Sequence, residues 1–275
     1  MTPPMEPPSP RRTRPWWWRL TRSTLFIYGA VSIFVFFASE SMMFVPPSSD
    51  APDPHRWVRT KDGTAIAFHL VRPAQPAPAV ILLSHGNAED LSTVGPEVGD
   101  LARQLGIAVA SYDYPGYGVS AGRPTEKGAV AAIRAAYQEL ITTEGFRPEQ
   151  VLLYGRSIGS GPTVALAEET PVAGMILENA FVSAYRVVTG LPIFPFDRFP
   201  NLRRIRNVSV PTLFFVSAED RIIAPWHTDK LHAASAATDK TRVRVDGAGH
   251  NNLSHVLGSQ YWDTIREFAR KVESK

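Results

Sequence analysis

The stretch VLLYGRSIGSG, residues 151–161, places a serine between two glycines at the end of an apolar run. The apolar residues predict a buried strand, and the residues that follow, GPTVALAEE, predict a helix. A serine on the tight turn from a strand into a helix is typical of a nucleophile elbow, which exposes the hydroxyl above a sheet. Gly155 and Gly159 suit such a turn because they have no side chain. Ser157 is therefore a candidate nucleophile.

The turn around Ser157 has two other interpretations. It can be an ordinary glycine-rich loop, or a cradle of backbone N–H groups for phosphate. The phosphate-binding patterns GxGxxG and GxxxxGKS/T do not occur there. The strand before the serine and the helix after it favour the nucleophile.

A serine hydroxyl is a weak nucleophile until a base takes its proton. His250, in VDGAGHNN, directly follows an apolar run on a loop that can bring its ring to the sheet edge. Asp220 ends the run TLFFVSAED and can orient the imidazole. Glu219 is the alternative acid, since neighbouring side chains point in opposite directions. The order Ser157, Asp220, His250, each after a strand, predicts a catalytic triad.

Other polar residues near the predicted strands are expected to be structural. His85 precedes a glycine in a tight loop, and Asp113 stands before Pro115 in a glycine-rich turn. Three further histidines lie on or near predicted helices and are expected at the surface: His227, His232 and His255.

Acyl transfer by a serine passes through an oxyanion that needs backbone N–H donors. The N–H of Ile158, the residue after the candidate nucleophile, is one expected donor. The loop SHGNAED, residues 84–90, is the expected source of the other, and we favour the N–H of Asn87.

The rest of the chain alternates short apolar runs with helical patterns, which predicts an α/β fold with a mostly parallel sheet flanked by helices. Ligands of such sheets bind at the carboxyl ends of the strands. A hairpin is expected around Asp62–Gly63, and Tyr261 begins a closing amphipathic helix. The runs that predict strands are 79–86, 107–114, 151–155, 172–179, 212–220 and 241–249.

One segment, residues 180–208, is rich in aromatics and proline and has no clean period. We expect it to form a small cap over the strand ends. Its apolar side chains either line an acyl pocket or pack in the core. The candidate substrate-binding residues are Phe181, Tyr185, Leu191, Phe194 and Phe196.

Composition excludes several classes of function. Five arginines against Glu6 give the first 24 residues a net charge of +4, and since the chain totals +3, the remainder carries −1. The residues after position 24 therefore lack the excess of positive charge that binding to nucleic acid requires. The absence of cysteine excludes disulfides and thiolate chemistry. Nothing in the sequence indicates a metal or an organic cofactor.

The N-terminal residues predict a membrane anchor. Residues 1–24 are expected to be a disordered basic tail, and residues 25–45 would rise about 31 Å as a helix, enough to cross a bilayer. Trp16–Trp18 suit the membrane interface, and the arginines before the span predict a cytoplasmic N-terminus. Residues 46–54 read as a linker to a catalytic domain at 55–275, outside the cytoplasm (periplasmic or extracellular).

Two alternatives to the anchor remain open. Ser39 and Ser41 have the small-residue spacing of a signal-peptide cleavage site, so the domain can instead be secreted after cleavage. The apolar segment can also be a buried core helix, although it shows no polar stripe.

Five motifs together carry a family resemblance: SHGNAED, YDYPGYGVSAGRPTEKG, LLYGRSIGSGPTVALA, SAEDRIIAP and GAGHNN. Over roughly residues 55–272 the chain resembles the α/β-hydrolase superfamily, above all its membrane-tethered serine hydrolases, a branch that includes protein depalmitoylases. The resemblance implies an α/β-hydrolase fold and the triad above. The eukaryotic depalmitoylases carry an N-terminal cysteine cluster for lipidation, which this chain lacks.

The function expected is a serine ester hydrolase that acts on small-molecule or lipid-like esters or thioesters through an acyl-enzyme. An amidase or peptidase would use the same triad, and a non-catalytic binding protein on a hydrolase scaffold is a third hypothesis.

Overall fold

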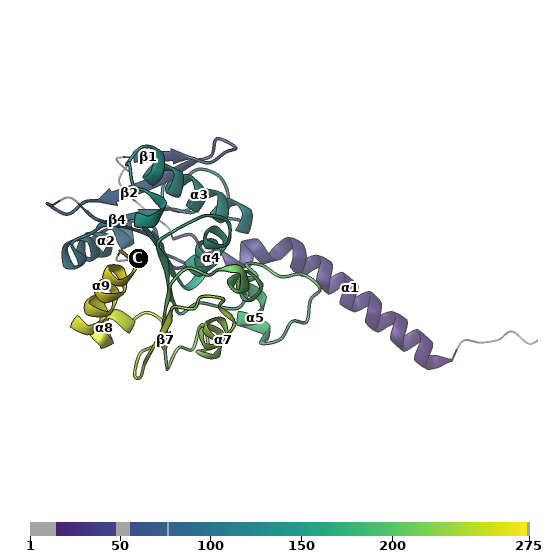
Figure 1. The fold of residues 1–275 in the computed structure, drawn as a ribbon. Coiled ribbons are helices and arrows are strands. Elements are labelled where there is room, and N and C mark those ends of the chain that lie inside the picture. The colour runs from purple at the N-terminus through teal and green to yellow at the C-terminus, as the bar shows by residue number, and fades with distance from the viewer. Residues whose placement is uncertain (1–14, 48–55, 76, 274–275) are drawn as a thin grey trace, which may run out of the picture. The chain divides into compact units, whose positions relative to one another are not determined.

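The computed structural model describes residues 15–47, 56–75 and 77–273 (Figure 1). Internal contacts divide the chain into two compact units, Met1–Ser39 and Glu40–Lys275. The first 14 residues of the predicted tail and most of the predicted linker lie outside the described residues. The second unit includes Glu40, and so begins within the segment predicted as the anchor.

An apolar helix does occupy the N-terminal region. Helix α1, Trp16–Met43, is 28 residues long, and its length and composition would allow it to cross a membrane. Large apolar side chains such as Phe26 and Phe37 are exposed along it. The apolar helix is confirmed, while a membrane span stays a prediction.

The second unit contains an eight-stranded sheet in the order β1-β2-β4-β3-β5-β6-β7-β8. The strands from β4 to β8 along this order run parallel, and the pairings β1–β2 and β2–β4 are antiparallel. The mostly parallel sheet is confirmed. The strands are β1 Arg56–Arg59, β2 Ala65–Val71, β3 Val80–Ser84, β4 Ala108–Tyr112, β5 Val151–Arg156, β6 Gly174–Glu178, β7 Thr212–Ser217 and β8 Lys240–Val245.

Helices follow the parallel strands, and local sequence sets their ends. The Asp90 side chain accepts the first N–H groups of α2, and Gly106 ends that helix in the left-handed region. Thr125 caps α3, because its side chain accepts the N–H of Gly128. The helices are α2 Leu91–Leu105, α3 Glu126–Thr142, α4 Ser160–Glu169, α5 Ala184–Thr189, α6 Asn201–Arg204, α7 Trp226–Ala234, α8 Leu253–Leu257 and α9 Ser259–Glu273.

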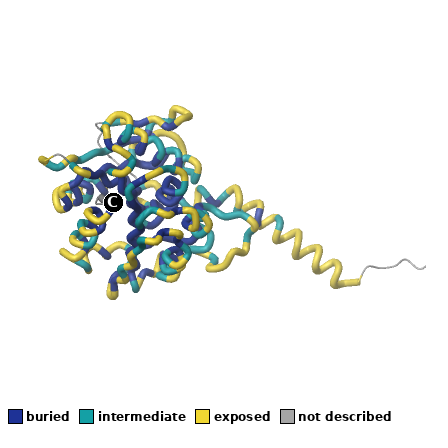
Figure 2. Tube along the Cα trace, viewed as in Figure 1, coloured by how far each residue is buried: buried dark blue, intermediate teal, exposed yellow. Residues whose placement is uncertain are grey.

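The sheet has one apolar cluster on each face, because successive side chains of a strand point to opposite sides. Val80 and Leu82 of β3 belong to the cluster under α3 and α4, whereas Ile81 and Leu83 belong to the cluster under α2 and α9. Buried residues accordingly run through the strands of the sheet (Figure 2). Burial on both faces explains why the inner strands β3 to β7 are largely apolar, whereas the edge strands β1 and β8 carry charged side chains.

The turn from β5 into α4 lies very close to the end of β3. A Cβ on Gly159 would come within 2.1 Å of the Ser84 carbonyl oxygen. A Cβ on Gly155 would come within 2.7 Å of the Thr163 hydroxyl. The two glycines that flank Ser157 are therefore required by the close approach of three backbone segments.

The segment 180–208 contains α5, α6 and a short 3-10 helix, Ile205–Asn207. Phe199 anchors it, since a Cβ on Gly161 of α4 would meet the Phe199 ring at 2.4 Å. Val188, Leu191 and Ile193 are exposed. The segment is thus tied to α4 at one end and carries apolar side chains at its surface.

We expect Gly159→Ala to lower the free energy of unfolding by about 3 kcal/mol, because neither the new Cβ nor the backbone carbonyls it meets can move away. Urea denaturation followed by circular dichroism measures the loss. Gly99→Ala is the matched control, since a Cβ on Gly99 in α2 meets only the flexible end of the Arg103 side chain, at 3.3 Å. The control should be neutral or stabilising by about 0.5–1 kcal/mol. Equal unfolding midpoints for the two variants would contradict the close packing described here.

Candidate active site

Ser157 lies at the carboxyl end of β5 in a strained backbone conformation. Its φ is +54°, in the left-handed region that residues with a side chain rarely adopt. The residue is 8% exposed, and the Ser160 hydroxyl donates to its carbonyl oxygen at 2.7 Å. The local structure is the strained strand–turn–helix that the sequence predicts.

The structure brings the three predicted triad residues together. His250 Nε2 lies 3.0 Å from Ser157 Oγ, and His250 Nδ1 lies 2.6 Å from Asp220 Oδ2. The other oxygen of Asp220 accepts the N–H groups of Ile222 and Ile223, both at 2.8 Å. A continuous chain of hydrogen bonds therefore runs from the Ser157 hydroxyl through the imidazole to a carboxylate that is fixed by its own loop.

The other candidates for acid and base lie elsewhere. Glu219 is exposed, whereas its neighbour Asp220 is buried. The expectation that His227 lies at the surface is wrong. His227 is buried, its Nδ1 accepts the N–H of Val182, and burial lowers its pKa to about 4. Position on a nine-residue helix does not decide burial here, because α7 packs against β7 and His227 bonds to the segment that follows β6.

His85 and Asp113 are buried structural residues, as expected. The His85 ring packs against Tyr114 with centroids 4.4 Å apart, and its Nδ1 lies 2.8 Å from the Gly86 carbonyl oxygen. Asp113 Oδ1 accepts the N–H of Leu91 at 2.8 Å. Both side chains stabilise the loop between β3 and α2, residues 85–90, which we call the β3–α2 loop.

The β3–α2 loop restricts which amide is able to act as the second oxyanion donor. The N–H of Gly86 donates to Glu89 Oε2 at 2.6 Å. This bond occupies the Gly86 N–H, and Asn87, the predicted donor, is the next residue of the loop. Ile158, the other predicted donor, begins the turn of the elbow and is buried.

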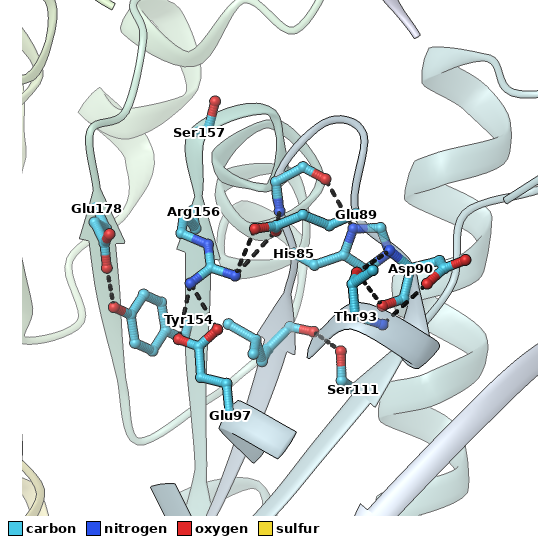
Figure 3. A network of polar contacts seen from close by, with 12 residues as sticks. His85, Glu89, Asp90, Thr93, Glu97, Ser111, Tyr154, Arg156, Ser157 and Glu178 are labelled. Atoms are coloured by element: carbon cyan, nitrogen blue, oxygen red, sulfur yellow. Dashed lines mark hydrogen bonds and ion pairs between the residues drawn. The ribbon is translucent and has the colours of Figure 1, made fainter. Parts of the chain in front are cut away.

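A partly buried ionic network that the sequence analysis missed lies beneath the elbow (Figure 3). Arg156 Nη1 donates to both carboxylate oxygens of Glu97 at 2.8 Å, and its Nη2 donates to Glu89 at 2.9 and 3.1 Å. Because Glu89 also accepts the Gly86 N–H, one side chain links the residue before Ser157 to the β3–α2 loop. The available signal was an arginine within an apolar strand.

The same network continues to the neighbouring strand. Tyr154 donates to Glu178 of β6 and lies 2.6 Å from the Tyr261 hydroxyl. Complete burial raises the pKa of Glu178, an effect that Arg156 partly offsets. Tyr154 and Arg156 share a face of β5 because they are two residues apart.

Asn179 is a further residue that the sequence analysis missed. It has a positive φ of +47° directly after β6. Its Oδ1 accepts the N–H of Ser217, and its Nδ2 donates to the His250 carbonyl at 3.1 Å. Asn179 thus joins the ends of β6 and β7 to the loop that carries the candidate base.

The five predicted substrate-binding residues do not form one pocket. Tyr185, Phe194 and Phe196 form an aromatic cluster with ring centroids 5.7–5.9 Å apart. Phe181 instead packs in the core against Phe199, and Leu191 is 67% exposed.

An open cavity of about 480 Å³ lies beside the aromatic cluster. Its lining does not include Ser157 or His250. The lining residues are Arg186, Pro192, Phe194, Pro195, Phe196, Asp197, Pro200 and Arg203. Within the part of the chain that the structure describes, no group of three or more metal-ligating side chains is gathered.

Comparison with known proteins places these features in context. Residues 75–195 match the family described as serine aminopeptidase, S33. The chain is 36% identical over 221 residues to alpha/beta hydrolase domain-containing protein 17C of Xenopus tropicalis, covering 80% of this chain and 70% of that protein. It is 37% identical over 212 residues to protein 17B of Homo sapiens, covering 76% and 73%.

Solved structures share the fold at low identity. The esterase Pf2001 of Pyrococcus furiosus superposes with a TM-score of 0.70 at 13% identity, over 82% of this chain and 99% of that one. Est1E from Butyrivibrio proteoclasticus, solved with ferulic acid bound, gives 0.64 at 14% identity, over 80% and 100%. These likenesses confirm the predicted α/β-hydrolase fold.

We expect Arg156→Met to lower the free energy of unfolding by about 2–3 kcal/mol, because it removes the hydrogen-bonded cation from the partly buried carboxylates of Glu89 and Glu97. Urea denaturation measures the effect. Arg134→Met is the control, since the pair of Arg134 with Glu169 is 42% exposed on both sides and should contribute about 0–1 kcal/mol. An Arg156 variant as stable as the Arg134 variant would refute the importance of the network.

Proposed function

We propose that this chain, which belongs to the alpha/beta hydrolase domain-containing protein 17 family, is a serine hydrolase that cleaves carboxylic esters through Ser157, His250 and Asp220. One observation carries the proposal. The His250 ring lies within hydrogen-bonding distance of the Ser157 hydroxyl on one side and of the Asp220 carboxylate on the other. This is the arrangement that acyl transfer by serine requires.

The proposed reaction has two steps. His250 Nε2 takes the proton of Ser157 as Oγ attacks the acyl carbonyl, and the N–H groups of Ile158 and Asn87 stabilise the oxyanion. The imidazolium, paired with Asp220, gives its proton to the leaving alcohol, and the ester bond breaks to leave an acyl-enzyme. Water, deprotonated by the same imidazole, then releases the carboxylic acid and restores the Ser157 hydroxyl.

The proposed substrate class is a lipid-like or long-chain acyl ester or thioester. The aromatic cluster of Tyr185, Phe194 and Phe196, together with the exposed Leu191, supports an apolar acyl group. Phe181 is left out of the proposed pocket because it packs in the core.

A second candidate function is amide hydrolysis. The match of residues 75–195 to the serine aminopeptidase family favours it, and the same triad would serve. Amide and ester cleavage differ in the leaving group, so matched substrates separate them.

We also propose that α1 anchors the chain in a membrane, with the N-terminus in the cytoplasm and the hydrolase unit outside. The exposed apolar side chains of α1 and the arginines before it support this topology. After alkaline extraction, an anchored chain should stay in the membrane pellet. Release of the chain into the supernatant, with the N-terminal segment removed, would favour a cleaved signal peptide instead.

We expect Ser157→Ala to reduce p-nitrophenyl ester turnover by at least about 10⁴-fold, because it removes the attacking group while leaving the fold intact. A fluorophosphonate probe should label the wild-type protein once, at Ser157. Ser254→Ala, a change at an exposed serine on α8, should retain activity and labelling.

The same preparations decide between the candidate functions. Faster turnover of p-nitrophenyl acyl esters than of matched p-nitroanilides supports the esterase, and the reverse preference supports the amidase. A wild-type protein that neither turns over substrate nor takes the probe would instead be a binding protein on a hydrolase scaffold.

A further inference from the structure

Residues 40–45, which we call the strap, belong to the hydrolase unit although they lie in the segment predicted as the anchor and include the last residues of α1. Glu40 Oε1 accepts the N–H of Glu126, the first residue of α3, at 3.0 Å, and it lies 3.8 Å from the Arg198 guanidinium. A carboxylate at this position complements the positive end of the α3 dipole. The one charged residue of the apolar segment thus has its partners in the hydrolase unit.

Phe44 is the apolar anchor of the strap. It is 3% exposed, and its ring packs against Tyr114, Tyr117 and Phe199 with centroids 6.2–6.3 Å away. A buried phenylalanine with three aromatic neighbours contributes several kcal/mol of packing, of the order of 3–5 for truncation to alanine. The strap is therefore part of the core rather than a tether.

The side chain of Asn87 joins the strap to the β3–α2 loop. Asn87 Nδ2 donates to the Met43 carbonyl at 2.8 Å, and Asn87 Oδ1 accepts the Val45 N–H at 2.9 Å. The two bonds bracket Phe44 on the backbone. The Tyr117 hydroxyl donates to the same Asn87 oxygen at 2.6 Å.

Both tyrosines that pack against Phe44 also bond to the β3–α2 loop. Tyr114 donates to the His85 carbonyl at 2.6 Å, and Tyr117 donates to Asn87. Displacing Phe44 would therefore remove the support of two hydroxyl groups that hold the loop, besides freeing the Asn87 side chain.

We infer that the strap is a positioning element for catalysis: Phe44 and the Asn87 side chain hold the β3–α2 loop so that the Asn87 backbone N–H points at the oxyanion. The inference rests on the proposed function, since it assigns the strap to that same oxyanion site. A donor displaced by about 1 Å costs about a hundredfold in rate, so the strap acts on the transition state rather than on substrate binding.

The test uses the full-length protein in detergent micelles, with active sites counted by exhaustive fluorophosphonate labelling. We expect Phe44→Ala and Asn87→Ala each to lower kcat per labelled site by about tenfold or more, with KM changed less than about threefold. A trifluoromethyl ketone, which forms a tetrahedral adduct with serine, should lose affinity by the same factor as kcat. Phe44→Leu, which keeps most of the ring volume, should restore most of the rate.

Phe146→Ala is the matched control for stability. Phe146 is 6% exposed and precedes β5, at the end of the sheet opposite Ser157. Its replacement by alanine should therefore destabilise the protein, while kcat per labelled site stays at the wild-type value. A Phe44→Ala protein that loses stability but keeps wild-type kcat per site and ketone affinity would overturn the inference and leave the proposed function intact. Absence of labelling and turnover in the wild type would overturn both.

The double variant tests the route through Asn87. If the strap acts through this side chain, Phe44→Ala should lower kcat little further when Asn87 is already alanine. A full second loss of about tenfold would show that Phe44 acts by another path and would overturn the assignment.

Discussion

The close approach of the β5–α4 turn to the end of β3 is the constraint on which the site depends. Gly159 packs directly on the carbonyl groups of Ser84 and His85, so the turn that carries Ser157 and the β3–α2 loop share one boundary. A strained backbone conformation persists only where the surrounding structure holds it, and this contact helps to hold the positive φ of Ser157. A nucleophile and an oxyanion donor placed on two such segments have little freedom to move apart.

The β3–α2 loop is held from two sides. From beneath the elbow, Arg156 binds Glu89 of the loop, whose carboxylate also accepts the Gly86 N–H. From the other side, the strap binds the Asn87 side chain, and Tyr117, which packs against the strap, bonds to the same side chain. Asn179 likewise fixes the loop that carries His250, because its Nδ2 donates to the His250 carbonyl. These two loops are thus fixed by polar side chains that lie outside the triad, in keeping with the precise geometry that acyl transfer requires.

Much of the fold and the core of the candidate site could be predicted from sequence. Local signals sufficed for the strands, for the caps at Thr125 and Gly106, and for the elbow, because each depends on near neighbours. The choice of Asp220 over Glu219 agrees with their burial. The catalytic roles of Ser157, Asp220 and His250 stay a proposal.

The features that sequence could not reveal all depend on tertiary packing. The partners of Arg156 come from α2 and the β3–α2 loop, and no local pattern joins them. Hydropathy assigned Phe44 and Glu40 to an apolar span because it does not distinguish a side chain that faces lipid from one that enters a core. Phe181 and His227 were misplaced for the same reason: their surroundings come from distant segments.

The burial of Arg156 has a consequence for the medium in which the protein works. Dissolved ions weaken attraction between charges at a surface, but they have much less effect on a pair withdrawn from solvent. The Arg156 side chain is 16% exposed, and those of Glu89 and Glu97 are 33% and 29% exposed, so the network lies between these two cases. The spacing between the elbow and the β3–α2 loop should therefore vary less with ionic strength than a contact between fully exposed charges, whichever side of a membrane the hydrolase unit faces.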